Sequence, residues 1–318
     1  MKVSKTFILL VAIILVLTVI FVFISGFYYE FEKHSCNLYL YSIPSDAKIY
    51  INEEYYGNTP LMISHLDVDK ILPIKVSREN YHIIQREIYT RPLSMTEIIL
   101  LDRYKNRKDG MLLRWIKGSR KTKGFFMAEH LVKTSQYLKF MESSNASNIE
   151  ISKWLDYNDG DCPIHFKNGK YGLRKKSDDI PITEVSYYGA IAYTKWVKGF
   201  LPDENEFIMA VNMGNSSVLY PWGVMEDIDI SYFFKDFNWL ESFPKPVKSF
   251  PASSSYVYDL IGDCWQWTRS IDADDKVMAK GGIYYIQDGV PDCYERRILD
   301  KTTTQFDVGF RYIIYDLP

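Results

Sequence analysis

The segment Gly262-Asp263-Cys264-Trp265-Gln266-Trp267-Thr268 decides the fold of this 318-residue chain. Trp265 and Trp267 are separated by one residue, so both rings point to the same side of an extended strand. Two rings of that size on one face require burial, and we expect both to be core residues rather than platforms for a ligand. Gly262 allows a tight entry into the strand, because glycine adopts backbone angles that other residues avoid.

Short motifs surround this segment in a fixed order. Leu201-Pro202-Asp203-Glu204-Asn205-Glu206-Phe207 and Tyr220-Pro221-Trp222-Gly223 precede it, and Gly281-Gly282 and Gly309-Phe310-Arg311 follow it. In this order the motifs resemble the formylglycine-generating enzyme, or sulfatase-modifying factor, family. The resemblance runs from about Met111 to the end of the sequence and implies a loop-rich fold like that of a C-type lectin. Its structural signature comprises Trp222, Gly262, Trp265, Trp267, Gly281, Gly282, Gly309, Phe310 and Arg311.

Residues 37–101 are predicted to form a separate small β-domain. Two short segments, Lys48 to Ile51 and Glu54 to Tyr56, flank Asn52-Glu53, which suits a hairpin turn. Pro44-Ser45-Asp46-Ala47 and the later Gly57-Asn58-Thr59-Pro60 resemble motifs of the PEGA domain. That resemblance implies a spacer or wall-facing module of surface and periplasmic proteins. The expected fold class is therefore α+β, a PEGA-like β-domain followed by the lectin-like domain.

The N-terminal segment is predicted to be a transmembrane signal anchor over residues 7–24. These eighteen residues are apolar except for Thr18, and as a helix they would rise ~27 Å, close to the ~30 Å thickness of the hydrocarbon core. Lys2 and Lys5 favour a cytoplasmic N-terminus, residues 1–6. The bulk of the chain would then lie outside the cytoplasm, in the periplasm or at the cell surface. A cleaved signal peptide is the alternative, although its apolar run is usually shorter, at ~7–15 residues.

Residues 102–110 are predicted to be a basic linker before a lectin-like domain of residues 111–318. From Arg103 to Lys123 the only acidic residue is Asp109, against nine lysines and arginines, and such a run is usually solvated. Within the domain we expect strands at 111–117 and 125–127. Helices are expected at 132–141, with Thr134 as N-cap, at 187–196 and at 204–211.

The composition limits the classes of partner. A net charge of −2 argues against nucleic acid or another polyanion. The 25 tyrosines and 18 phenylalanines are typical of β-rich structure, and the alternative is a surface for carbohydrate or peptide. The five histidines show no metal-ligand spacing.

The resemblance also implies a copper site. Active members of the family oxidise a sulfatase cysteine to formylglycine with O2 and copper, which two cysteines hold after an Arg-Gly-Gly-Ser motif. Here Ile286 and Pro291 stand at those two positions, and Cys293 is a weak catalytic candidate two residues further on. Because Cu(I) prefers a pair of thiolates, we expect no copper site and no oxidase activity.

Calcium is the second ion that the resemblance implies. Asp263 and Gln266 stand in the family's calcium segment and could form a weak site, or could instead bond to loop backbone. Arg311 is expected to form a buried structural ion pair. An oxidising compartment would permit one disulfide among Cys162, Cys264 and Cys293, whereas Cys36 could cross-link partners or stay free.

Three functions remain open. The first is a membrane-anchored, non-catalytic binding or scaffold module that acts on an envelope protein or a wall component. The second is a formylglycine-generating oxidase with rearranged ligands. The third is a carbohydrate-binding module that uses the aromatic surface.

Overall fold

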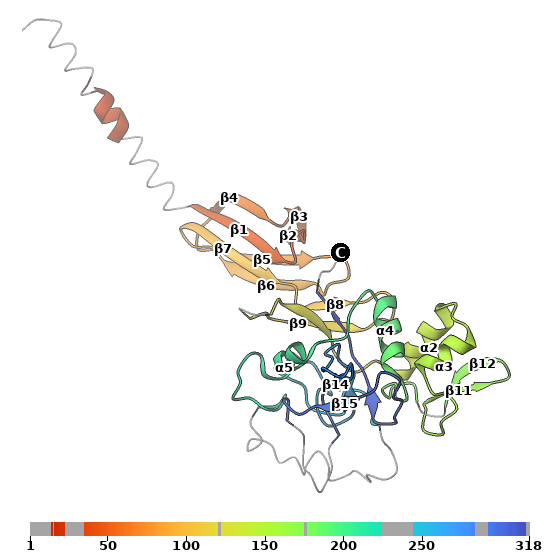
Figure 1. Ribbon diagram of the computed structural model, residues 1–318. Helices are drawn as coiled ribbons and strands as arrows, with labels where there is room; N and C mark the ends of the chain where they lie inside the picture. Colours follow the sequence, from red (N-terminus) through yellow and green to blue (C-terminus); the bar gives the residue numbers. More distant parts are fainter. Residues whose placement is uncertain are drawn as a thin grey trace, which may run out of the picture. The chain divides into compact units, whose positions relative to one another are not determined.

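The computed structural model describes Ile14 and residues 16–22, 35–119, 122–174, 177–223, 244–283 and 292–315 (Figure 1). The chain divides into two compact units, which meet between Leu101 and Asp102. Most of the expected transmembrane segment, residues 7–24, lies outside the described residues. Among the residues that are described, no helix has the length and apolar character needed to cross a membrane.

The first unit is built from two β-sheets. One sheet has the strand order β4-β1-β7, and the other has the order β3-β2-β5-β6. The β1–β7 pair is parallel, and the other described pairs of this unit are antiparallel. The strands are β1 (Ser35–Ile43), β2 (Lys48–Ile51), β3 (Glu54–Asn58), β4 (Leu61–Asp67), β5 (Ile71–Ser77), β6 (Ile84–Tyr89) and β7 (Leu93–Leu100).

The predicted hairpin is confirmed in this unit. Asn52 and Glu53 join β2 to β3 with φ values of 49° and 67°, and two positive φ values are what a tight hairpin with the twist of its strands requires. Along β1, Leu38 and Leu40 are fully buried whereas Tyr41 is exposed. This alternation gives the sheet one core face and one outer face.

The segment predicted to be a basic linker is instead part of the second unit. Strand β8 (Arg103–Lys105) pairs with β9 (Leu112–Ile116). Asp109 is buried and accepts hydrogen bonds from the hydroxyls of Tyr193, at 2.7 Å, and Tyr312, at 3.0 Å. The prediction was wrong because basic side chains on a strand can reach solvent while the backbone beneath them pairs.

The second unit combines one small sheet with helices and short ribbons. Its sheet has the order β17-β10-β9-β8. Helix α3 packs beside α4, and the β11–β12 ribbon lies near α2 (Figure 1). The remaining elements are β10 (Phe125–Ala128), α2 (Thr134–Ser143), α3 (Asn148–Trp154), β11 (Ile164–Lys167), β12 (Lys170–Leu173), α4 (Tyr187–Trp196), α5 (Glu204–Asn212), β13 (Trp265–Gln266), β14 (Val277–Ala279), β15 (Arg297–Leu299), β16 (Val308–Gly309) and β17 (Ile313–Ile314).

The helix predictions are largely confirmed. Helix α4 has the predicted bounds, and the Ser186 hydroxyl caps it by accepting a hydrogen bond from the Gly189 amide at 3.2 Å. Helix α2 begins at Thr134 instead of 132, and its N-cap is Lys133. The Thr134 hydroxyl donates to the Ile180 carbonyl at 3.1 Å, so it serves a tertiary contact and not the predicted cap.

Aromatic rings fill one part of the second unit's core. Tyr137 and Tyr193 are fully buried and stack with their centroids 5.8 Å apart. Phe310, from the signature, meets both rings edge-on, at 6.1 Å and 5.3 Å, an arrangement that aromatic quadrupoles favour. Part of the aromatic composition is therefore explained by core packing.

Candidate functional site

The tryptophan segment runs through the interior of the second unit. Trp267 is fully buried, as predicted, and its indole N–H donates to the Val185 carbonyl at 2.8 Å. Trp265 is only half-buried, so the prediction that both rings are buried is wrong. Cys264 and Gln266, on the opposite face of β13, are themselves fully buried. Because protein covers both faces of this short strand, burial does not follow the simple alternation.

Arg311 is the centre of a hydrogen-bond network beside this strand, and we call such a side chain a hub. Its side chain is fully buried, and its Nε donates to the Gln266 Oε1 at 2.6 Å. Its terminal nitrogens donate to the backbone carbonyls of Ala128, Tyr258 and Asp259 at 2.7–3.3 Å. Burial lowers the pKa of Arg311 to about 10, so the group stays charged at neutral pH. Among the described residues Arg311 forms no ion pair, so the predicted pair is replaced by charge-assisted hydrogen bonds to the Gln266 side chain and to backbone carbonyls.

The signature glycines allow this packing. Gly281 has φ 101°, and a Cβ there would lie 2.8 Å from the Cys264 carbonyl oxygen. Gly262 has φ 108°, and a Cβ there would lie 2.7 Å from the Phe250 ring. Larger residues would therefore clash at both positions, in a backbone region that L-residues rarely adopt.

Asp263 and Gln266 do not fit a calcium ion. The Gln266 oxygen is engaged by Arg311, and its amide nitrogen donates to the carbonyls of Asp259 and Leu260. Asp263 accepts one hydrogen bond, from a backbone amide, and burial raises the pKa of this carboxyl well above its usual value. Calcium takes ~6–8 oxygen ligands, whereas no cluster of three acidic, histidine or cysteine side chains suited to a metal occurs among the described residues. Both residues instead form hydrogen bonds to loop backbone, which is the alternative role predicted from the sequence.

Cys293 lies in the apolar core of the second unit. It is fully buried, and its thiol faces the Val218 carbonyl at 3.9 Å. Burial and the neighbouring Asp292 raise the pKa of Cys293 to about 11, against the opposing charge of Lys280. A thiol with this pKa is protonated at neutral pH, and it is the thiolate that attacks substrates or binds metals.

The copper positions of the family correspond here to two residues without a thiol. Ile286 and Pro291 lie outside the described residues. All four cysteines are described, all are buried, and none forms a disulfide. The permitted disulfide is therefore not formed, and the buried Cys36 is not placed to cross-link partners. One buried thiol does not make a two-thiolate copper site.

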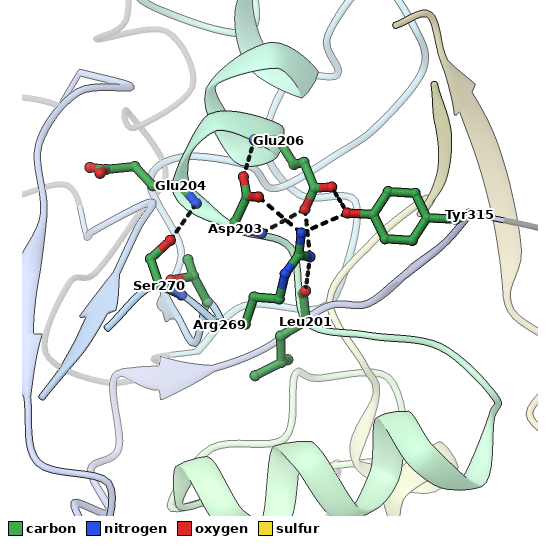
Figure 2. A network of polar contacts seen from close by, with 8 residues as sticks. Leu201, Asp203, Glu204, Glu206, Arg269, Ser270 and Tyr315 are labelled. Atoms are coloured by element: carbon green, nitrogen blue, oxygen red, sulfur yellow. Dashed lines mark hydrogen bonds and ion pairs between the residues drawn. The ribbon is translucent and has the colours of Figure 1, made fainter. Parts of the chain in front are cut away.

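A second hub, Arg269, escaped prediction. Figure 2 shows its guanidinium between Asp203, Glu206 and Tyr315. It donates to Glu206 at 2.7 Å, to Asp203 at 2.9 Å, to the Tyr315 hydroxyl at 2.6 Å and to the Leu201 carbonyl at 2.8 Å. Asp203 and Glu206 also cap α5 reciprocally, through bonds of 2.7 and 2.8 Å. The hub joins the N-terminus of α5 to the chain after the tryptophan segment.

A buried lysine was also missed. Lys280 is fully buried and pairs with Glu204 at 3.2 Å. Burial lowers its pKa, and the Glu204 charge opposes that change. Lys280 stands directly before Gly281-Gly282, at the position where the family motif has arginine. This position was the feature of the sequence that could have identified it.

Two family models match the chain. Residues 115–315 match the sulfatase-modifying factor enzyme 1-like domain, and residues 35–101 match the PEGA domain. Serine/threonine-protein kinase pkn1 of Chlamydia caviae is 27% identical over 239 residues, 71% of this chain and 35% of that protein. Inactive C-alpha-formylglycine-generating enzyme 2 of Bos taurus is 33% identical over 112 residues, 31% of this chain and 35% of that protein. The chain thus spans about a third of each of these relatives.

Among solved structures, PvdO from Pseudomonas aeruginosa aligns with a TM-score of 0.49 at 15% identity, covering 67% of this chain and 98% of that one. The order of the two domain matches confirms the two resemblances found in the sequence. Since the first match covers well over half of the residues, the chain belongs to the sulfatase-modifying factor enzyme 1-like family and carries a PEGA domain ahead of that domain.

Proposed function

We propose that this protein is a non-catalytic binding or scaffold module of its family. The observation that carries the proposal is the state of Cys293, a fully buried thiol whose pKa burial raises to about 11. The sequence has isoleucine and proline at the two positions where active members carry copper ligands. A relative that shares the domain is itself named an inactive enzyme, which supports the same reading.

The test is a turnover assay on the purified chain. The chain is incubated with Cu(I), O2 and a peptide that contains the Cys-x-Pro-x-Arg motif of sulfatases, and mass spectrometry follows conversion of the cysteine to the aldehyde. We expect no conversion by the wild type or by Cys293→Ser. Turnover that disappears in Cys293→Ser would restore the oxidase function.

We further propose that residues 7–24 anchor the chain in a membrane with its bulk outside the cytoplasm. The support is the apolar run with Lys2 and Lys5 before it. The PEGA domain would then act as a spacer, and the partner would be an envelope protein or a wall component. Protease added to intact spheroplasts should digest the second unit, and protection of that unit would refute this orientation.

A further inference from the structure

An open groove of about 480 Å³ lies between two helices of the second unit. It is lined from α3 and the turn before it by Ser147, Ile149, Glu150, Lys153 and Trp154, and from α4 by Tyr188. The volume is within the roughly 300–1,000 Å³ of small-molecule sites. None of the lining residues belongs to the family signature or to the two arginine hubs. The groove is therefore separate from the residues that carry the family signature and from both arginine networks.

The aromatic walls of the groove are held in place from behind. The Trp154 ring stacks on Phe140 with centroids 5.3 Å apart and an interplanar angle of 26°. Tyr188 meets the neighbouring Tyr187 edge-on at 6.2 Å, and it remains 47% exposed. Ile149 adds an aliphatic surface that is 75% exposed. The groove thus offers a ligand one ring held by stacking, Trp154, and two exposed apolar surfaces, Tyr188 and Ile149.

Helix α3 itself is fastened at both ends, so the groove is preorganised. At its start the Tyr171 hydroxyl donates to the Asn148 side chain at 2.9 Å. At its end the Trp154 carbonyl accepts a hydrogen bond from the Ser186 amide at 2.9 Å. A preformed site avoids part of the entropic cost of binding.

The polar side chains of the groove remain available. Glu150 and Lys153 are exposed and one helical turn apart, yet no ion pair or side-chain hydrogen bond joins either of them to another described residue. The Ser147 hydroxyl accepts a bond from the Glu150 amide at 3.2 Å, which leaves its proton free to donate. The groove therefore presents one carboxylate, one ammonium and one hydroxyl, with no net charge.

We propose that this groove binds a neutral oligosaccharide, an inference that rests on the proposed binding function. The C–H faces of a pyranose stack on aromatic rings, and its hydroxyls both donate and accept, as the mixed polar set requires. A polyanion or polycation gains nothing from a groove without net charge. An amphipathic peptide helix needs a groove whose lining side chains are mainly apolar, whereas three of the six lining residues here, Ser147, Glu150 and Lys153, are polar or charged.

The experiment is calorimetric titration of the full chain with three neutral probes, chitotriose, cellotriose and maltotriose. We expect at least one probe to bind the wild type and Tyr188→Ala to weaken that binding at least about fivefold, from loss of a stacking face. Tyr188→Phe should retain most of the affinity, and Glu150→Gln should weaken it. The matched control is Tyr294→Ala, which removes a tyrosine that is 42% exposed and does not line the groove, and it should bind like the wild type.

Failure of all three probes to bind at millimolar concentration would overturn the proposal, as would binding that Tyr188→Ala leaves unchanged. Binding of a short peptide that Tyr188→Ala abolishes would overturn it in favour of a protein partner. The turnover assay separates this result from the proposed function. Absence of sugar binding without formylglycine turnover removes only the ligand class, whereas turnover removes the non-catalytic function.

Discussion

The two units satisfy their buried backbone in different ways. In the described part of the first unit, residues 35–101, seven strands form two sheets and include most of the residues. In the second unit β13, β16 and β17 have two residues each, so ladder bonds reach only a little of the chain around them. There the Arg311 side chain supplies donors to the carbonyl of Ala128, at the end of β10, and to the loop carbonyls of Tyr258 and Asp259. A loop-rich interior thus depends on a few polar side chains, because buried carbonyls must find donors.

One ion pair from each unit shows the same contrast. In the first unit Lys75 pairs with Glu53, whose side chain is 70% exposed. In the second unit Arg269 pairs with Glu206, whose side chain is 1% exposed. Exposed pairs contribute little to stability, whereas breaking a buried pair leaves a charge without compensation. Mutational sensitivity should therefore concentrate in the second unit.

The largest expected effect comes from Arg311→Met. The substitution leaves the Gln266 oxygen and several carbonyls without their donor, and the free energy of unfolding should fall by about 5 kcal/mol, since each unsatisfied buried group costs roughly 1–3 kcal/mol. All seven tryptophans lie in the second unit, so urea unfolding followed by tryptophan fluorescence reports this unit alone. Arg311→Lys cannot reproduce the guanidinium fork and should rescue little. Full rescue by lysine would show that charge alone suffices.

The second prediction compares two tryptophans of the same strand. Trp267→Ala should cost about 3–5 kcal/mol, the range for a buried large aromatic, because its ring is fully buried. Trp265→Ala should cost only about 1–2 kcal/mol, because its ring is half-buried and less apolar surface is lost. The midpoints of urea unfolding give both values. Equal costs would contradict the difference in burial between the two positions.

A buried carboxyl provides the third prediction. Glu184 is 5% exposed, and burial together with the charges of Asp159, Asp156, Asp161 and Asp307 raises its pKa to about 7. The folded state therefore holds this proton more tightly than the unfolded state. Its contribution to stability is present below pH ~4.5 and is lost as pH rises to about 7.

Glu184→Gln removes this dependence. Between pH 5 and pH 8 the wild type should lose on the order of 2 kcal/mol more than the variant. The pKa of His130, which burial lowers to about 4, acts in the opposite sense but is common to both proteins, so their difference isolates Glu184. Parallel stability curves for the two proteins would show that Glu184 ionises normally in the folded state.

The smallest effect is expected in the first unit. Glu53→Gln removes the exposed pair with Lys75 and should change stability by less than about 0.5 kcal/mol. Amide hydrogen exchange of β2 and β5, which flank the pair, measures this unit without tryptophan. A loss of more than about 2 kcal/mol would erase the contrast between the units, since it exceeds the range for exposed pairs.

The sequence predicted much of this fold because its strongest signals are local. The ordered motifs around Trp267 identified the family, and the spacing of Ala190, Tyr193 and Trp196 gave the bounds of α4. The tight turn at Asn52-Glu53 was likewise predicted from adjacent residues. The helix and turn signals each lie within about ten residues, where backbone geometry links pattern to structure, whereas the family motifs were recognised by their order along the chain.

Long-range polar contacts could not be predicted. The carbonyl partners of Arg311 carry no signal in the side-chain sequence, because every residue has a carbonyl. Asp109 meets Tyr193 and Tyr312 from 84 and 203 residues away, and a run of basic residues concealed its burial. The groove between α3 and α4 depends on the packing of two helices, and neither helix pattern reveals it alone.

The pairing of β10 with β17 has a consequence for biosynthesis. Residues 126–127 pair with residues 313–314, and Arg311 lies directly before the second of these segments. After β10 has been made, almost two hundred further residues must leave the ribosome before the second unit can close its sheet and position Arg311. Residues 35–101, in contrast, can fold while the rest of the chain is being made. During that interval the tryptophan-rich interior is exposed, so a nascent chain stalled before residue 311 is a natural substrate for chaperones.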